Sequence, residues 1–566
     1  MEKTLPPIRS LQEGKMCERY MAPLSLLRGC GYSYEDLARP RIAVINTFSE
    51  MNPGHIHLKK VGETVKKGIY DAGGMGFEFN CVSVCDSVAE GPYVLPSRDM
   101  LVNEIELLVE GNKMDAMVLI GTCDKVVPGL LMAAARLDLP AIVVSGGYMQ
   151  TGSYKGEPCD FINIGMTLSQ VLEGTREQAD LDGVVEHACP GPGACGMMGT
   201  ANSMNIIAET LGMSLPGNST TAAVSEKLED IAYRAGRQIM TLWENGITAR
   251  KIITPASITN AIKVCMAVGG SSNTIIHIPA IATEAELDME CSRVYTEASN
   301  EIPLLVGIRP NQGMHTMGEF DAAGGLGAVL SILKDHLDQN VLTVTGKTMA
   351  ENLSEHPEMC VVRNPELIHS LEDPVSTDGG LVLCKGTLAP GGAIVKRSAA
   401  PENMLSFRGP AKVFDDCDKA IAALYDGTIQ AGDIVVIRYQ GVKAGPATAY
   451  PFVTALKGSK LKDRVAMITD GRTSGAAAGA CFQYVSPEAA LRGPLCAVQD
   501  GDIISYDINQ QKLDVELPAD ELEKRIREAV IPLKIKKGFL GIYQRCVGPF
   551  MKGAVLRGEA ETGEER

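Results

Sequence analysis

The sequence predicts an α/β protein with at least two domains, an N-terminal αβα domain and a β-rich C-terminal domain. In the first two thirds of the chain, short apolar runs rich in β-branched residues alternate with segments of helical periodicity, which is typical of a mostly parallel sheet covered on both faces. From about residue 370, short strands follow one another through Gly and Asp turns, which indicates a barrel or a sandwich. The length of 566 residues also exceeds what one hydrophobic core normally organises.

The first domain is expected to contain strands whose carboxyl ends lead into functional loops. The predicted strands are residues 41–48, 114–121 and 139–147, and the predicted helices between them are 56–74 and 95–111. Further helices are expected within 200–280, and a Gly-rich break opens another within 319–337. Ligands of parallel α/β sheets bind beyond the carboxyl ends of the strands, so the loops there are the first places to look for chemistry.

The second domain is expected to consist mainly of short strands. They are predicted within residues 379–398, 431–441, 464–472 and 500–517.

Charge and composition narrow the function classes. The net charge of −16 argues against nucleic acid and anionic membranes as partners, and an anionic substrate would need a local cation to offset it. The first 20 residues lack the apolar core of a signal peptide, and no run of about 18 apolar residues predicts a membrane span. The 16 scattered cysteines fit reduced thiols better than a disulfide scaffold, so we expect a cytoplasmic protein.

Three cysteines stand in loops rather than in apolar periodic runs, namely Cys85, Cys123 and Cys195. Their spacing matches no local cluster motif, and a free cysteine is more often an inert packing residue. Two of them, however, come directly before an aspartate, Asp86 or Asp124, at predicted strand ends. Because thiolates suit iron and carboxylates suit Mg²⁺, such Cys-Asp pairs can serve two adjacent metal centres.

Lys125 directly follows Cys123 and Asp124. An ammonium group beside a metal-binding carboxylate would repel the ion. Three roles are therefore open for Lys125: it binds a substrate carboxylate, it becomes an anionic ligand through carbamylation, or it is an ordinary solvated lysine.

In the second domain, the stretch MITDGRTSGAAAGACF (467–482) leads from a predicted strand into a Gly/Ala loop that lets backbone approach a ligand closely. Ser474 could act there as a nucleophile or a base, and Arg472 could bind a substrate carboxylate. The alternative is an ordinary turn formed by Asp470 and Gly471. The sequence contains neither a G-x-x-x-x-G-K-[ST] phosphate loop nor a G-x-G-x-x-G fingerprint after a strand.

Long stretches of the chain resemble the Fe–S dehydratases, the family that includes dihydroxy-acid, phosphogluconate and aldonic-acid dehydratases. They cover nearly the whole chain in order, and include EFNCVSVCDSVAEG, GTCDKVVPGLLMAAARLDLPAIVVSGG, GACGMMGTANSMNIIAETLGMSLPGNST, GGSSNTIIHIPAIA and ITDGRTSGAAAGACFQYVSPEAALRGPLCAVQDGDII. The resemblance implies an α/β domain over residues 1–375 that binds the metals, and a β-barrel-like domain over 376–566 that carries a catalytic serine. It also implies a homodimer or a dimer of dimers, with the active site between the domains and completed at the dimer interface.

Position by position, the resemblance also assigns site residues. Cys123 and Cys195 match ligands of an Fe–S cluster. Asp86, Asp124 and a carbamylated Lys125 match Mg²⁺ ligands. Ser474 matches the serine that acts as the base.

Two departures from the family pattern stand out. Gly54 occupies the place where many members have a ligand cysteine, so we nominate Cys85 as the third cluster ligand, with Cys189 in reserve and His55 as a weaker candidate. The cluster type, 4Fe-4S or 2Fe-2S, stays open. Gln440 occupies the place of a Mg²⁺-binding glutamate, and it is kept only as a weak Mg²⁺ ligand because a neutral amide binds this ion less strongly than a carboxylate.

The resemblance implies a hydro-lyase that uses an Fe–S cluster and Mg²⁺ to dehydrate a 2,3-dihydroxy acid to a 2-oxo-3-deoxy acid. Both departures also occur in phosphogluconate dehydratase, and they favour a sugar acid such as an aldonate. The length and the segment NPGHIHL (52–58) favour the alternative, a dihydroxy-acid dehydratase that converts 2,3-dihydroxy-isovalerate to 2-oxoisovalerate. An alternative of another class is a catalytically silent Fe–S sensor, whereas the lack of a C-x-x-C motif disfavours a thiol-redox protein.

Overall fold

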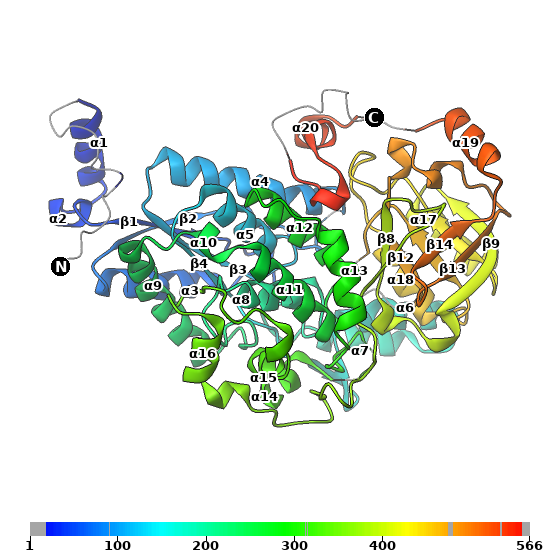
Figure 1. Cartoon of the computed structure of the whole chain (residues 1–566), viewed down its shortest axis with the longest axis horizontal. Helices are drawn as coiled ribbons and strands as arrows, with labels where there is room; N and C mark the ends of the chain where they lie inside the picture. The colour runs from blue at the N-terminus through cyan, green and yellow to red at the C-terminus, as the bar shows by residue number, and fades with distance from the viewer. Residues whose placement is uncertain are drawn as a thin grey trace.

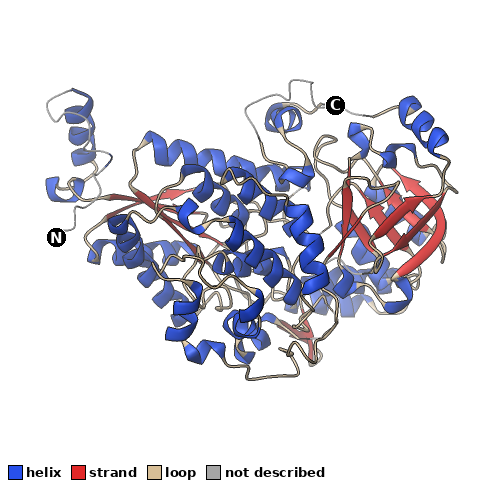
Figure 2. Ribbon diagram, viewed as in Figure 1, coloured by secondary structure: helices blue, strands red, loops and turns tan. Residues whose placement is uncertain are grey.

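The computed structural model describes residues 9, 18–89, 91–311, 313, 315–473, 479–532 and 535–556 of the chain. It has two bodies, a largely helical one around a small sheet and a smaller one around a large sheet (Figures 1 and 2). The predicted α/β class with a parallel first sheet is therefore confirmed. The boundary expected after residue 375 stays a prediction.

The first sheet has four parallel strands in the order β2-β1-β3-β4. Their bounds are Arg41–Asn46 for β1, Met75–Asn80 for β2, Ala116–Gly121 for β3 and Ala141–Ser145 for β4. Three of them lie within the predicted ranges. The predicted ranges do not include β2, although a strand end was expected before Cys85, because this edge strand is only half-buried and its polar side chains interrupt the apolar pattern.

Two helix pairs cover this sheet (Figure 1). Helix α3 (Leu58–Asp71) packs against α9 (Glu226–Asn245), and α4 (Gly91–Gly111) packs against α5 (Val126–Leu137). Strands β3 and β4 are buried along their whole length between these layers. Sheet and helices together fix the loops at the carboxyl ends of β1, β2 and β3.

Further helices surround this core, and their bounds follow capping and breaking residues. They include α8 (Thr200–Thr210), α11 (Pro255–Ala267), α12 (Thr274–Glu284) and α13 (Cys291–Glu301). Thr254 starts α11 with a capping box, and Pro255 takes the first helical position. The helix expected within 319–337 is two helices, α14 (Met317–Ala323) and α15 (Gly325–Ile332), because Gly324 and Gly325 adopt φ values of 126° and 57° that only glycine adopts readily.

The second sheet has eight strands in the order β14-β13-β9-β10-β11-β12-β8-β7. Their bounds are Val382–Cys384 (β7), Gly392–Val395 (β8), Ser406–Phe414 (β9), Ile434–Ile437 (β10), Ala466–Thr469 (β11), Cys481–Ser486 (β12), Ile503–Asp507 (β13) and Lys512–Val515 (β14). The two edge strands meet, because Lys385 N donates to Gln511 O at 2.9 Å and Leu513 N donates to Lys385 O at 3.0 Å. The sheet is thus nearly closed, and the second body is barrel-like as the resemblance implied.

The C-terminal segment returns to the first body. After α20 (Gly538–Cys546), the side chains of Val547, Phe550, Ala554 and Val555 belong to the same buried cluster as the first sheet. Figure 1 shows this segment, in red, beside α4 and α12. Residues far apart in sequence therefore contribute to one core.

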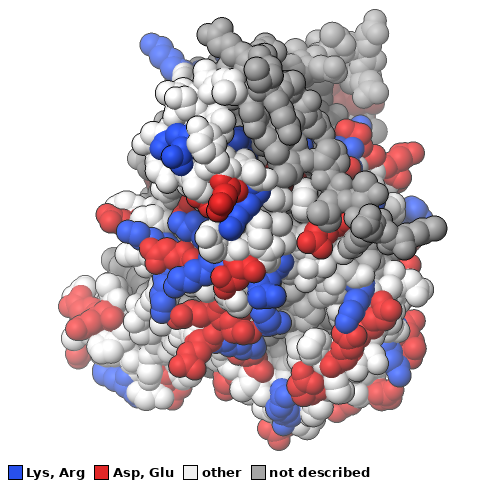
Figure 3. Space-filling view, turned by 90° about the vertical axis from the view of Figure 1, so that its left-hand side faces the viewer, with Lys and Arg blue, Asp and Glu red and all other residues white. Residues whose placement is uncertain are grey.

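On the face that Figure 3 displays, the acidic and basic side chains of the described residues are interspersed. No helix within the described ranges is long and apolar enough to cross a membrane.

Candidate active site at the carboxyl edge of the parallel sheet

The turn between β3 and α5 brings Cys123, Asp124 and Lys125 to the carboxyl edge of the first sheet. His55 holds this turn in place. Its Nε2 accepts hydrogen bonds from Thr122 N at 3.3 Å and Cys123 N at 3.0 Å, while its Nδ1 donates to Thr47 O at 2.7 Å. Burial lowers the pKa of His55 to about 4, so the ring is neutral. Because both ring nitrogens are engaged, His55 positions Cys123 and has no lone pair left for iron.

The three nominated thiols come together around this turn. Cys85 and Cys123 share a side-chain hydrogen bond, and this contact is the main cause that lowers the pKa of Cys85 and raises that of Cys123. Cys195 lies close enough to raise the pKa of Cys123 further, and its own pKa is raised by burial, then by Asp124 and Cys85. Cys189 is exposed, although Cys85 also acts on it electrostatically.

Gly54 lies directly beside Cys123. A Cβ atom at position 54 would lie 2.5 Å from Cys123 Sγ, a contact that real Cβ atoms do not make. Cys123 Sγ also approaches Asn52 Oδ1 at 3.1 Å. The missing side chain at Gly54 therefore leaves space that the Cys123 thiol uses.

Two carboxylates and one buried amine form the second part of the site. Lys125 Nζ lies 3.6 Å from Asp86 Oδ2 and 3.7 Å from Asp124 Oδ2, and Lys125 is only 1% exposed. Within the described residues this nitrogen has no hydrogen-bond partner. Burial lowers the pKa of Lys125 against the opposing pull of the two carboxylates. Burial also raises the pKa of Asp124.

Arg472, which follows β11, reaches across from the second body to this cluster. Its Nη1 donates to Asp86 Oδ1 at 2.7 Å and Oδ2 at 2.9 Å, and the side chain is 2% exposed. Burial alone would raise the pKa of Asp86, but Arg472 and Lys125 together hold that pKa below its usual range. In this structure Arg472 therefore binds Asp86, and its expected contact with a substrate carboxylate stays a prediction.

Ser474 and Gln440 are the other two site candidates in the second body. Ser474 lies outside the described residues. Gln440 is buried, and a Cβ atom at Gly471, the residue before Arg472, would overlap with its Cβ. Its amide nitrogen donates to Arg438 O at 3.4 Å, and among the described residues its side chain has no hydrogen bond to Asp86, Asp124 or Lys125. A role of Gln440 in Mg²⁺ binding stays a prediction.

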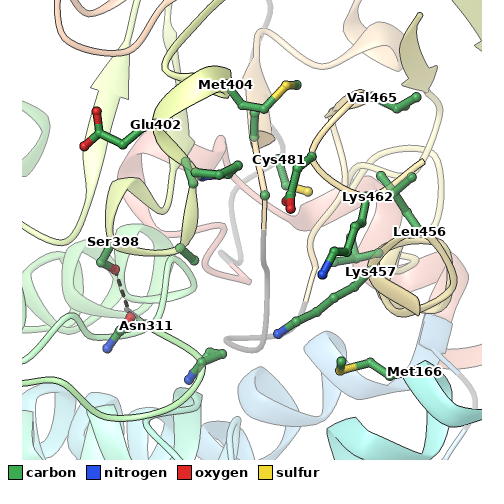
Figure 4. Close-up of a pocket in the computed structure, with 18 residues that line it drawn as sticks. Met166, Asn311, Ser398, Glu402, Met404, Leu456, Lys457, Lys462, Val465 and Cys481 are labelled. Atoms are coloured by element: carbon green, nitrogen blue, oxygen red, sulfur yellow. Dashed lines mark hydrogen bonds between the residues drawn. The ribbon is translucent and has the colours of Figure 1, made fainter. Parts of the chain in front are cut away.

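A cavity of about 450 Å³ lies between α6 (Phe161–Leu172), α18 (Tyr450–Gly458) and the start of β12 (Figure 4). Lys457 and Lys462 point their ammonium groups into it, whereas Glu402 turns its carboxylate away. Apolar side chains such as Met166, Val453 and Leu456 form much of the wall. Met166, on the wall of the cavity, and Cys195 both pack against the small cluster formed by Ile162 and Met197.

The sequence reading did not single out two residues that border the site, Arg98 and His277. Both are fully buried, and Arg98 Nη1 lies 3.3 Å from His277 Nδ1. Lys125, Arg98 and Arg472 all act on His277 electrostatically. A histidine within the apolar segment IIHIPAIA was the available signal, but a buried histidine in such a segment is more often a packing residue.

Comparison with known proteins identifies the family. Residues 39–352 match the family model of the dihydroxy-acid/6-phosphogluconate dehydratase N-terminal domain, and residues 366–554 match that of the C-terminal domain. A protein of Methanothermobacter thermautotrophicus named dihydroxy-acid dehydratase is 42% identical over 540 residues, which cover 94% of this chain and 97% of the relative. Proteins of the same name from Caldicellulosiruptor bescii and Acetivibrio thermocellus are 43% and 44% identical, with the same coverage.

These matches agree with the resemblance found in the sequence and cover both bodies of the structure. The named relatives also favour the alternative interpretation, a dihydroxy-acid dehydratase, over a sugar-acid enzyme. The chain belongs to the dihydroxy-acid/6-phosphogluconate dehydratase family and is a hydro-lyase.

Proposed function

We propose that the protein is a dihydroxy-acid dehydratase that converts 2,3-dihydroxy-isovalerate to 2-oxoisovalerate and water. This substrate assignment rests on the 42–44% sequence identity, over nearly the whole chain, to relatives named dihydroxy-acid dehydratase. Gly54 and Gln440 no longer weigh against it, because both are departures at single positions within that long match.

The side chains at the site fit the two metal groups that the family implies. Asp86 and Asp124 offer the oxygen ligands that Mg²⁺ prefers, and Lys125 Nζ is a buried nitrogen without a hydrogen-bond partner among the described residues. In the described part of the chain, no group of three or more His, Cys, Asp and Glu side chains could hold a metal ion by itself. A carbamate on Lys125 would supply the missing anionic donor for Mg²⁺.

The thiols fit an Fe–S cluster in a similar way. Cys85, Cys123 and Cys195 interact with one another, and thiolates are the usual ligands of such clusters. We propose these three as the ligands, with Cys85 in place of the cysteine that Gly54 replaces. When bound, the cluster and Mg²⁺ would supply Lewis acidity at the leaving hydroxyl and at the substrate carboxylate.

Three residues of the chain, Ser474, Arg472 and His55, would have distinct roles in the reaction. Ser474, as its alkoxide, would remove the proton at C2, this proton would pass to the hydroxyl group at C3, which leaves as water, and the enol would tautomerise to the 2-oxo acid. Arg472 would hold Asp86 in place through its two Nη1 contacts. His55 would keep the turn at Cys123 rigid through two backbone amides.

The cavity between α6, α18 and the start of β12 would provide the access route for the anionic substrate. Lys457 carries a partly buried ammonium group that forms no ion pair among the described residues and points into the cavity (Figure 4). A cation there offsets the net charge of −16 at the place where a carboxylate must approach. Functional assembly as a homodimer or a dimer of dimers belongs to the same proposal.

Turnover by anaerobically purified, reconstituted protein tests the function. We expect it to dehydrate 2,3-dihydroxy-isovalerate, detected as a 2-oxo acid with a carbonyl reagent, and to act on aldonates and 6-phosphogluconate at least about tenfold more slowly in kcat/KM. Preference for a sugar acid would reverse the substrate assignment. Iron-containing protein that is inert to the whole panel would favour the alternative of a silent Fe–S sensor.

A further inference from the structure

Two buried nitrogens beside the site lack hydrogen-bond partners within the described ranges. They are Lys125 Nζ and His277 Nε2, and the two side chains are 1% and 0% exposed. Lys125 stands at the start of α5, and His277 lies in the first turns of α12, which packs against α5. A buried polar group without a hydrogen-bond partner destabilises the folded protein. Two such groups on neighbouring helices at a metal site suggest that a common partner belongs between them.

The contact between Arg98 and His277 fixes which nitrogen of the histidine carries the proton. A guanidinium group has only donors, so Arg98 Nη1 must donate and His277 Nδ1 must accept across their 3.3 Å contact. Burial, then Lys125, Arg98 and Arg472, hold the pKa of His277 well below its usual value, so the ring is neutral. The single ring proton is therefore on Nε2, and this nitrogen is a hydrogen-bond donor.

Arg98 is itself held rigidly. Its Nη2 donates to Gly553 O at 2.9 Å and Ala554 O at 2.7 Å, and also to Asp99 Oδ2 at 3.0 Å. Leu556 N donates to Asp99 Oδ1 at 2.9 Å, which ties the same C-terminal segment to α4. The direction in which Arg98 presents Nη1 to the histidine is thus set by backbone that comes 455 residues later in the chain.

We propose that His277 is a positioning residue for Lys125, and that its Nε2–H donates to an oxygen of the carbamate that Lys125 carries in the active protein. This inference rests on the proposed function, which includes carbamylated Lys125. It gives His277 Nε2 an acceptor, because a carbamate on Lys125 replaces the three donors of an ammonium group by one N–H and two acceptor oxygens.

The modification itself is balanced and involves no redox change. The neutral amine of Lys125 attacks the carbon of CO₂, a C–N bond forms, and the electrons of one C=O π bond move to oxygen. The nitrogen releases one proton to solvent and a carbamate anion remains.

A matched pair of substitutions tests the donor. His277→Gln places an amide N–H near the position of Nε2, whereas the side chain of His277→Asn is too short to reach it. The carbamate is measured by ¹³C NMR of the holoprotein titrated with ¹³C-bicarbonate, and loss of the signal in Lys125→Arg assigns it to Lys125. We expect His277→Asn to need at least about tenfold more bicarbonate for half-modification, and His277→Gln to stay within about threefold of the wild type.

Each outcome decides the proposal. Equal bicarbonate requirement of the wild type and the folded His277→Asn variant would overturn it. If the shorter side chain prevents folding, His277→Phe fills the space without a donor and repeats the comparison. Absence of the carbamate signal in active wild-type protein would also overturn it, while the dehydratase function would stand. Absence of turnover in carbamylated wild-type protein would instead refute the proposed function.

Discussion

Glu488 is a carboxylic acid kept neutral in the interior of the second body. It is 2% exposed, and Lys443 N donates to its Oε1 at 2.9 Å. Its Oε2 has no partner among the described residues and lies against Gly441, where any Cβ would overlap with it. Burial, and then the neighbouring Asp470, raise the pKa of Glu488 to about 8. A proton on this carboxyl group therefore belongs to the folded state near neutral pH.

This proton predicts how stability depends on pH. Between the usual glutamate pKa of 4.5 and about 8, the unfolded chain releases a proton that the folded chain retains. The contribution of Glu488 to the free energy of unfolding therefore falls as pH rises through this window, by up to about 1.4 kcal/mol per pH unit. Glu488→Gln keeps the shape but removes the proton equilibrium. We expect its Tm to exceed that of the wild type at about pH 8 and to differ little at about pH 5.

Thermal unfolding at the two pH values, monitored by circular dichroism, checks this prediction. Glu186→Gln, in the exposed part of α7 (Gln178–His187), removes the same charge without burial and serves as the control. Parallel pH dependence of Tm in Glu488→Gln and the wild type would show that Glu488 titrates normally.

At the scale of elements, the loops that follow strands explain which parts of the site the sequence could reveal. Cys123, Asp124 and Lys125 directly follow an apolar strand, and the rule that ligands bind at strand ends locates them from sequence alone. Cys85 and Asp86 were found by the repeated Cys-Asp pair, although the strand before them is an irregular edge strand.

Arg98 and His277 could not be located in the same way. Both lie inside helices. Their positions in the sequence do not reveal which side chain of another helix they contact or which tautomer His277 adopts. The first sheet was largely predictable, because most of its strands are continuous apolar runs. Strand β12 was not predicted, because it begins inside a stretch whose Gly and Ala residues predict a loop.

The loop after β2 provides a direct test of the third thiol. Cys85→Ser should lose most of its iron and sulfide after anaerobic reconstitution, because an oxygen replaces the sulfur that contacts Cys123. Cys189→Ser is the matched control, since Cys189 is exposed and was only the reserve candidate. Iron, sulfide and visible absorbance are measured in both variants. If the cluster is retained in Cys85→Ser and lost in Cys189→Ser, Cys189 and not Cys85 is the third cluster ligand.

At the scale of the whole molecule, a net charge of −16 opposes the approach of any carboxylate. Cations are therefore needed locally, and the ammonium groups of Lys457 and Lys462 point into the cavity (Figure 4). Burial, then the neighbouring Arg309, lower the pKa of Lys457, which is consistent with a cation that has little solvent around it.

Salt dependence of the kinetics tests this access route. At low ionic strength, Lys457→Gln should reduce kcat/KM by about three- to tenfold, mainly through KM, and the difference from the wild type should shrink as salt screens the charge. Lys460→Gln makes the same change of charge at an exposed position outside the cavity wall, and it should have a small effect. Equal effects of the two substitutions would mean that only the overall charge matters and that the cavity is not the route.

The bonds between Arg98 and the carbonyl groups of Gly553 and Ala554 also bear on how the protein is made. After the ribosome has added Arg98 to the chain, it must add 455 more residues before the first of these acceptors exists. During all of that synthesis the guanidinium group of Arg98, which is fully buried in the folded protein, has Asp99 beside it but lacks these two carbonyl acceptors, so the nascent first body cannot reach its final packing at α4 and α12. We therefore expect incomplete translation products that end before residue 553 to bind no metal and to be degraded readily by cellular proteases.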